Sequence, residues 1–244
     1  MSKVFCVYRR ELAAYFNTPI AYFFIPIFIG LTAGIFLKMG SAAFFFRGVA
    51  EMRYFFFAMP WALFIFAPAI TLRLWSDELR VGTAELLLTL PYDVWQLVVG
   101  KFLAAYTVLA CSLALTLGVP IAVGYAGNPD WGPIVCGYIG SLLMGGALIS
   151  MGAFVSSLTQ NQVIALLLSL LGGVVLVLVL SPDLAAFVSG DNKTMAMVIE
   201  YLGVRSHFED FEKGILSISD TVYFLSVMVV FNLLNVFWVE SRRY

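Results

Sequence analysis

The sequence has few of the residues from which most catalytic and metal sites are built. It contains one histidine, three cysteines and 12% charged residues, against 61% hydrophobic residues. A Ser/His/Asp triad or a histidine-based metal site therefore has almost nothing to draw on, and we interpret His207 as a loop residue. We interpret the isolated Cys6, Cys111 and Cys136 as small apolar residues rather than as disulfides or metal ligands.

The sequence also lacks a basic tract and a phosphate-binding loop. The net charge is −1 and no basic tract is present, so we expect no nucleic-acid partner. The pair Gly100-Lys101 is followed by Phe102 and lacks the glycine-rich approach of a phosphate-binding loop. If ATP drives this protein, another chain must bind it.

Long apolar segments are what the sequence does have. They fall into blocks of about 20 residues, the length that crosses a bilayer. We therefore predict an all-α membrane protein, one domain over residues 1–244, with six transmembrane helices. The predicted spans cover residues 20–37, 54–74, 97–125, 134–155, 163–180 and 221–239.

The predicted cores of these spans contain no Asp, Glu, Lys, Arg or His. Ion-coupled carriers and proton channels use such groups, so their absence argues against both. A pathway for amphipathic or lipid-linked cargo fits, and so does a helix bundle that transmits motion. A lipid-modifying enzyme has little support, because a solvated acidic loop explains the group Glu209, Asp210 and Glu212 better than an acid–base site does.

Residues 2–16 predict an amphipathic helix whose apolar side chains cluster on one face. Such a helix lies in the membrane interface with its basic side toward lipid headgroups, which makes membrane lipids a partner. The alternative is an ordinary helix packed on protein. The basic residues of this interfacial helix are Lys3, Arg9 and Arg10.

Residues 76–92 carry the densest local helix signals in the chain. Ser76 can cap a short helix that Gly82 ends, and Thr83 can cap a second helix that Pro91 stops. Asp93 and Gln96 then form a capping-box pattern ahead of a long apolar segment. We therefore predict a rigid, folded connector lying along the membrane face.

Small residues at spacings of four mark the helix faces that can approach one another closely. We predict such packing at Gly30, Gly34, Gly137, Ser141 and Gly145. Thr18-Pro19 predicts the start of the first span, and Lys101, one turn into the third span, can snorkel to the interface. In the long polar segment 181–219 we expect a short helix over residues 194–202.

Six spans place both termini on one side of the membrane. More of the Lys and Arg residues fall on the side of the termini, which the positive-inside rule assigns to the cytoplasm. The connector is then cytoplasmic and the segment 181–219 extracytoplasmic.

Residues 80–104, RVGTAELLLTLPYDVWQLVVGKFLA, resemble the cytoplasmic coupling region of type-2 ABC exporter permeases, and are closest to the gliding-motility-type branch. Residues 205–226 are similar to the segment before the last span in that branch, where a His-Phe-x-x-Phe-x-x-Gly pattern occurs. The N-terminal R-R-E-L-x-x-Y-F-x-x-P-I-A-Y is also typical of it. The resemblance covers most of the chain.

The resemblance implies a non-catalytic permease subunit in the bacterial cytoplasmic (inner) membrane. It implies two ABC ATPase subunits that carry Mg-ATP, a second permease copy or homologue, and residues 2–16 as the connecting helix. We expect any periplasmic auxiliary domain to be a separate protein. The ATPase-coupling residues it indicates are Glu78, Arg80, Gly82, Thr83, Glu85, Leu86, Leu87, Leu90 and Pro91.

The leading hypothesis is therefore a permease of an ATP-driven exporter for an amphipathic, lipid-linked or polysaccharide-type cargo, in motility or surface assembly. The alternative is a membrane subunit that relays ATPase motion to an extracytoplasmic partner and transports nothing.

Overall fold

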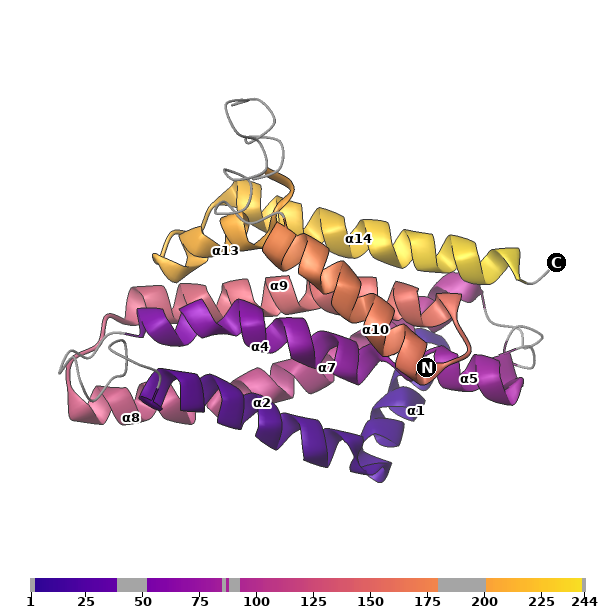
Figure 1. The fold of residues 1–244 in the computed structure, drawn as a ribbon, viewed down its shortest axis with the longest axis horizontal. Helices are drawn as coiled ribbons and strands as arrows, with labels where there is room; N and C mark the ends of the chain where they lie inside the picture. The colour runs from indigo at the N-terminus through magenta and orange to yellow at the C-terminus, as the bar shows by residue number, and fades with distance from the viewer. Residues whose placement is uncertain (1–2, 39–51, 85–86, 88–92, 180–200, 243–244) are drawn as a thin grey trace.

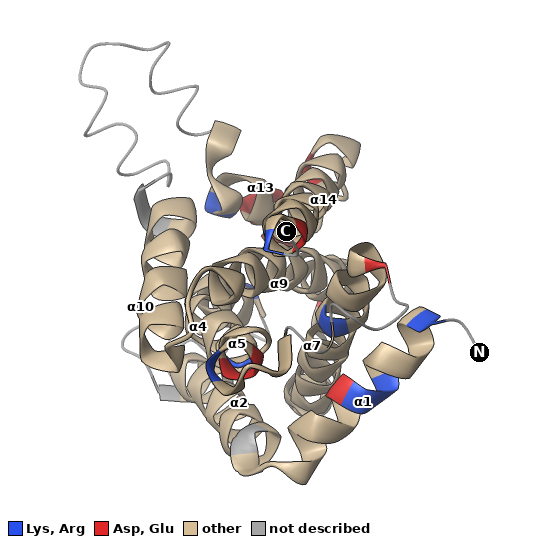
Figure 2. Ribbon diagram, turned by 90° about the vertical axis from the view of Figure 1, so that its right-hand side faces the viewer, with Lys and Arg blue, Asp and Glu red and all other residues tan. Residues whose placement is uncertain are grey.

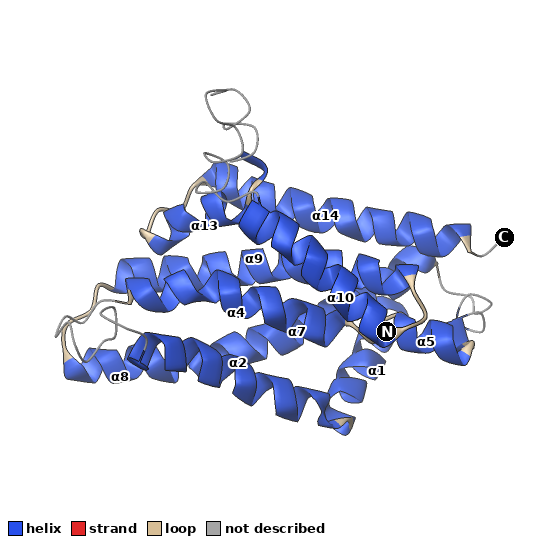
Figure 3. Cartoon of the chain, viewed as in Figure 1, coloured by secondary structure: helices blue, strands red, loops and turns tan. Residues whose placement is uncertain are grey.

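A computed structural model describes residues 3–38, 52–84, 87, 93–179 and 201–242. Every regular element in this part of the chain is helical (Figure 3). The α-helices are α1 (Lys3–Asn17), α2 (Pro19–Lys38), α4 (Arg53–Thr71), α5 (Ser76–Val81), α7 (Val94–Thr116), α8 (Gly118–Ala126), α9 (Trp131–Leu158), α10 (Gln162–Gly173), α13 (Val204–Glu212) and α14 (Ile218–Ser241), and a π-helix, η2 (Val174–Val179), follows α10.

Helix α9 is the centre of the bundle. It packs against α4, α7, α10, α13 and α14, which surround it in the end-on view of Figure 2. Small residues allow this close packing: a Cβ atom added at Gly137 would lie 2.6 Å from the ring of Phe56, and one at Gly145 would overlap Leu109. Ser141 is buried between them and donates its hydroxyl to Gly137 O at 2.7 Å.

The two ends of the bundle carry different elements. Helices α1 and α5 and the C-terminal end of α14 lie at one end in Figure 1, whereas α8 and α13 lie at the other. The expected short helix of residues 194–202 falls mostly outside the described residues. The sequence interpretation missed α13, although Val204, His207, Phe208 and Phe211 are buried at helical spacing.

The expectation of six spans is not confirmed. In the described residues four helices are long and apolar enough to cross a membrane, or five if the bent pair α1 and α2 is counted as one span. The fifth expected span corresponds to the shorter apolar helix Gln162–Val177, which ends in the π-helical turn η2. The third expected span is divided between α7 and α8, where Pro120 in the first turn of α8 has no N–H to continue the ladder.

Helix α2 begins at Pro19, as the Thr18-Pro19 pair predicts. The Thr18 hydroxyl does not cap it, however: it donates to Ala14 O at 2.9 Å, in the last turn of α1. Helices α1 and α2 meet at an angle of 76°. Of the cysteines, Cys136 is buried, as expected for a small apolar residue. Cys6 and Cys111 lie exposed on the surface of the single chain.

Candidate functional site

The break between α4 and α5 is the best candidate for a functional site. Helix α4 ends at Thr71 and α5 starts at Ser76, so the four residues between them interrupt the backbone ladder and leave carbonyl groups without an intrahelical partner. Ser76 does not cap α5, because its hydroxyl instead donates back to Leu72 O. Gly82, at φ 78°, ends α5 in the left-handed conformation, as predicted.

Side chains from three other helices satisfy these carbonyls. From α1, the buried Tyr15 hydroxyl donates to Ile70 O at 2.6 Å. From α7, Lys101 Nζ donates to Leu74 O at 2.7 Å, and from α9, Ser156 Oγ donates to Leu72 O at 3.2 Å. The break is therefore a fixed joint between five helices rather than a flexible hinge.

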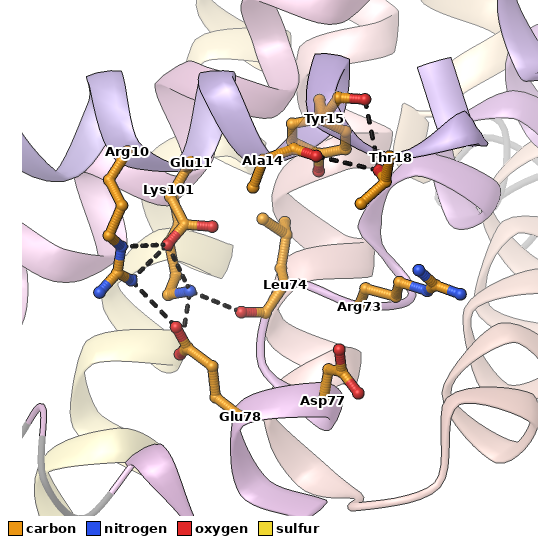
Figure 4. A pocket seen from close by; sticks show the side chains of 10 residues that line it. All are labelled: Arg10, Glu11, Ala14, Tyr15, Thr18, Arg73, Leu74, Asp77, Glu78 and Lys101. Carbon is orange, nitrogen blue, oxygen red and sulfur yellow. Dashed lines mark hydrogen bonds and ion pairs between the residues drawn. The ribbon is translucent and has the colours of Figure 1, made fainter. Parts of the chain in front are cut away.

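Lys101 is the middle of a cluster of four charged residues, shown in Figure 4 and called here the charge cluster: Arg10, Glu11, Glu78 and Lys101. Its ammonium lies 3.1 Å from Glu11 Oε1 and 2.9 Å from Glu78 Oε2. It also lies 4.9 Å from the centroid of the Trp75 ring. Arg10 pairs with both carboxylates and completes the cluster.

The snorkelling predicted for Lys101 is wrong. Its side chain is only 1% exposed, because Glu11 and Glu78 meet the ammonium inside the protein. A buried charge is tolerated only when it is paired and hydrogen-bonded, and here two carboxylates and one carbonyl do this. The cluster joins α1, α5 and α7 through one cation.

A glycine allows α1 to come close enough for this contact. A Cβ atom at Gly100 would lie 2.8 Å from Val7 Cβ and 3.2 Å from Val4 O, so only glycine fits between α7 and α1 here. The approach places Glu11, one turn after Val7, beside Lys101, the residue after Gly100. Two features of the sequence could have revealed the pair of Glu11 and Lys101. One is a glycine before a lone lysine inside an apolar segment, and the other is a single glutamate in the N-terminal helix.

The charge cluster sets the protonation of Glu11. Burial by itself would raise the pKa of this carboxyl, but the Lys101 ammonium and the Arg10 guanidinium more than offset it and hold the pKa below its usual 4.5. Burial raises the pKa of the neighbouring Tyr15 hydroxyl, which therefore stays a hydrogen-bond donor. The Glu11 carboxyl is therefore ionised at neutral pH.

A further contact ties α5 to α10. Asp77 Oδ1 accepts a hydrogen bond from Gln162 Nε2 at 2.8 Å and pairs with Arg80 at the same distance. The first residue of α10 thus holds one side of α5, while the charge cluster holds the other. Movement of α5 would be passed to α1, α7, α9 and α10.

The structure places the predicted coupling residues in two groups. Glu78 belongs to the charge cluster, whereas Arg80, Gly82 and Thr83 are exposed at the free end of α5. Leu87 is buried. The positions that lie outside the described residues are Glu85, Leu86, Leu90 and Pro91.

The interfacial residues of α1 divide in a similar way. Lys3 and Arg9 are exposed, as are Phe5 and Phe16, while Val7 and Tyr15 are buried against the bundle. Arg10 was predicted to face lipid headgroups, away from the protein. It instead pairs with Glu78, at 3.0 Å. Helix α1 therefore has a face on the protein and an exposed face with aromatic and basic groups. Its position in a membrane interface stays a prediction.

The predicted packing residues also separate. Gly137, Ser141 and Gly145 lie in the core of α9, as described above. Gly30 and Gly34 are exposed on α2, and a Cβ atom at either would meet no described atom within 4 Å. The described part of the chain thus uses the first set and leaves the second free.

A second buried polar group lies at the other end of the bundle. His207 on α13, expected to be a loop residue, is 7% exposed, and its Nδ1 lies 2.6 Å from Asp220 Oδ1 on α14. Its Nε2 lies 2.9 Å from Tyr201 O, and its ring stacks on Tyr223 with 3.9 Å between centroids. Asp220 lies in the first turn of α14, where Ser217 rather than Asp220 occupies the capping position.

A family model described as ABC-2 family transporter protein matches residues 10–237. The chain belongs to this family. The matched range contains both polar groups described above, and the apolar helices make this ABC-2 permease a multi-pass membrane protein. No curated protein matches the chain at a significant level.

The resemblance to ABC-2 permeases is thus confirmed, whereas the gliding-motility branch stays a prediction. The family is one of membrane transport components, whose members work with an ABC ATPase subunit.

Proposed function

We propose that the chain is the permease subunit of an ATP-driven exporter in the bacterial cytoplasmic (inner) membrane, with both termini and α5 in the cytoplasm. Two separate ABC ATPase subunits bind Mg-ATP and dock on α5 and the residues that follow it. The observation that carries the proposal is the fixed joint at α5, whose break is held by side chains of α1, α7 and α9. A push on the exposed end of α5 would move these helices together.

The proposal includes a second permease, either another copy or a homologue. The exposed pair Gly30 and Gly34 is a surface with room for the close approach of such a partner. The cargo we propose is amphipathic, lipid-linked or polysaccharide-like, in motility or surface assembly, and a separate periplasmic protein belongs to the same assembly.

Docking is tested at the free end of α5. Reversing the charge of Arg80 and shortening the 66%-exposed Val81 to Ala is expected to reduce co-purification of the ATPase and stimulation of its hydrolysis. Glu85→Lys and Leu86→Ala test two of the predicted coupling residues that follow α5 in the sequence. The matched control is Lys213→Glu at the opposite end of the bundle, where the side chain is 46% exposed. ATPase binding unchanged in all α5 variants would refute docking at this site.

Coupling is separated from docking by Lys101→Met. This variant keeps the exposed end of α5 but removes the cation that joins α5 to α1 and α7. We expect the ATPase to bind while cargo movement is lost. Full transport by a well-folded Lys101→Met protein would contradict the relay role of the joint.

The alternative is a subunit that relays motion and carries no cargo. Reconstituted vesicles distinguish the two functions. ATP turnover without movement of any candidate lipid or glycan, but with a changed state of an extracytoplasmic partner, would favour the relay.

A further inference from the structure

A cavity of about 320 Å³ lies beside the charge cluster, between α1, the α4–α5 break and α7 (Figure 4). Its volume falls at the lower end of the range for small-ligand sites, about 300–1,000 Å³. Its charged lining comprises Arg10, Glu11, Arg73, Asp77, Glu78 and Lys101.

The carboxylates of this lining are already engaged. Glu11 and Glu78 are neutralised by Lys101 and Arg10. Asp77 is held from outside the cavity by Arg80 and Gln162. None of them needs a ligand cation.

Arg73 differs from all of these groups. Arg73 is an exposed residue of the cavity lining, and its guanidinium forms no ion pair or hydrogen bond with any residue that the structure describes. In Figure 4 its side chain lies apart from the charge cluster, on the side of Thr18 and Asp77. Since Arg80 balances Asp77, the cavity has one positive charge in excess, carried by a group whose planar donors suit phosphate oxygens.

A small apolar groove lies between α2, which follows α1 in the chain, and α4, which precedes the break. Phe24 and Ile27 of α2 and Ile65 and Phe66 of α4 line it. With a rise of 1.5 Å per residue, it starts within about two helical turns of Thr18 and Arg73. The 76° bend between α1 and α2 stands at the same place, where an interfacial helix would turn into a membrane span.

We propose that this cavity binds the phosphate of a membrane phospholipid. Arg73 is the cation that contacts the phosphodiester, and one acyl chain lies in the groove between α2 and α4. The bound lipid joins the α1–α2 bend to the α4–α5 break, and so stabilises the region that carries the joint. The site needs a membrane but no ATPase, so it can be tested apart from the coupling function.

The test is a lipid titration of the full-length permease purified in detergent, followed by native mass spectrometry and by thermal unfolding. The probes are phosphatidylglycerol, diacylglycerol with the same chains, glycerol phosphate and inorganic phosphate. We expect phosphatidylglycerol to bind and to raise the unfolding temperature, and the other three probes to do so weakly. Arg73→Gln is expected to weaken phosphatidylglycerol binding about tenfold.

Two variants make this result specific. Lys213→Gln removes a half-exposed cation at the opposite end of the bundle and is expected to leave lipid binding unchanged. Ile65→Trp fills the groove and is expected to weaken the lipid, with unfolding of the lipid-free variants measured beside it to control for folding. Equal stabilisation by inorganic phosphate would show a free-anion site, and equal binding of diacylglycerol or unchanged binding by Arg73→Gln would refute the role of Arg73; each result overturns the proposal.

Discussion

The two ends of the bundle both bury ionisable groups, but they hold them in different ways. The charge cluster balances two cations with two carboxylates, and its central lysine also donates to a backbone carbonyl. At the other end His207 faces a single carboxylate, and the second oxygen of Asp220 is buried without a hydrogen bond from the described residues. One group is a network of ion pairs across three helices, and the other is one polar pair between two helices, with a stacked ring beside it.

The two polar groups also differ in the chemical group on which each depends. His207 Nε2 faces a backbone carbonyl, which only accepts, so this nitrogen carries hydrogen. A hydrogen bond over the 2.6 Å between Nδ1 and Asp220 Oδ1 then needs one hydrogen between these two atoms. The contact between His207 and Asp220 depends on that one hydrogen, whereas the charge cluster depends on the presence of Lys101.

The largest expected effect is therefore that of Lys101→Met. Removal of one partner of a buried ion pair leaves uncompensated charge and costs about 3 kcal/mol, here at Glu11 and Glu78. Thermal unfolding in detergent measures the loss. Lys213→Met removes a half-exposed lysine whose carboxylate partners lie 3.7 Å away, and should change stability by less than about 0.5 kcal/mol. Equal losses in the two variants would show that burial of Lys101 contributes nothing.

The next largest difference in stability is expected between alanine substitutions at a tightly packed glycine and at an exposed one. Gly137→Ala forces a methyl group against the fully buried Phe56, which is fixed by Phe55 and Tyr138, and should cost about 1–3 kcal/mol. Gly34→Ala meets no described atom and should be neutral or stabilising by up to about 1 kcal/mol. Unfolding curves of the two single variants decide this. A destabilised Gly34→Ala that also lost self-association in crosslinking would assign Gly34 to a contact between copies.

A smaller loss of stability is expected from changes at the contact between His207 and Asp220. Asp220→Ala leaves His207 Nδ1 buried without a partner and should cost about 1–2 kcal/mol. Asp220→Asn should retain most of this, because its amide can donate to Nδ1 while Nε2 still donates to Tyr201 O. Thermal unfolding of both variants gives the comparison. If Asn proved as damaging as Ala, a full charge pair rather than one shared hydrogen bond would hold α13 to α14.

The same two regions show how far the sequence leads. Local rules correctly predicted Pro19 at the start of α2, Gly82 at the end of α5 and the pairing of Asp93 with Gln96, because each depends on neighbours in the chain. The assignment of the α5 region as the coupling site, which rests on the family motif, stays a prediction. Lys101 was misjudged because its partner Glu11 is 90 positions away, and the approach of α1 depends on Gly100.

The prediction for the end of the bundle that carries α13 was wrong for a related reason. The charges of residues 204–212 suggested a solvated loop, although His207, Phe208 and Phe211 lie on one face and become buried when α13 packs on α9 and α14. The six-span count assumed that each apolar block of about 20 residues forms a helix long enough to span the membrane. The π-helical turn after α10 depends on packing as well as on hydropathy.

The smallest effect we expect is a pH response of the charge cluster. The pKa of Glu11 is lower in the folded protein than its usual 4.5, so its ionised form stabilises the fold above that pH. This contribution is lost as the pH falls below 4.5 through the folded value, and should be smaller than the loss in Lys101→Met. Unfolding temperatures between pH 7 and pH 3 measure it, with Glu11→Gln as the reference that lacks the titrating group. A difference between wild type and Glu11→Gln that stayed constant over this range would show that the pKa of Glu11 is not lowered by folding, and that Lys101 is neutralised by Glu78 alone.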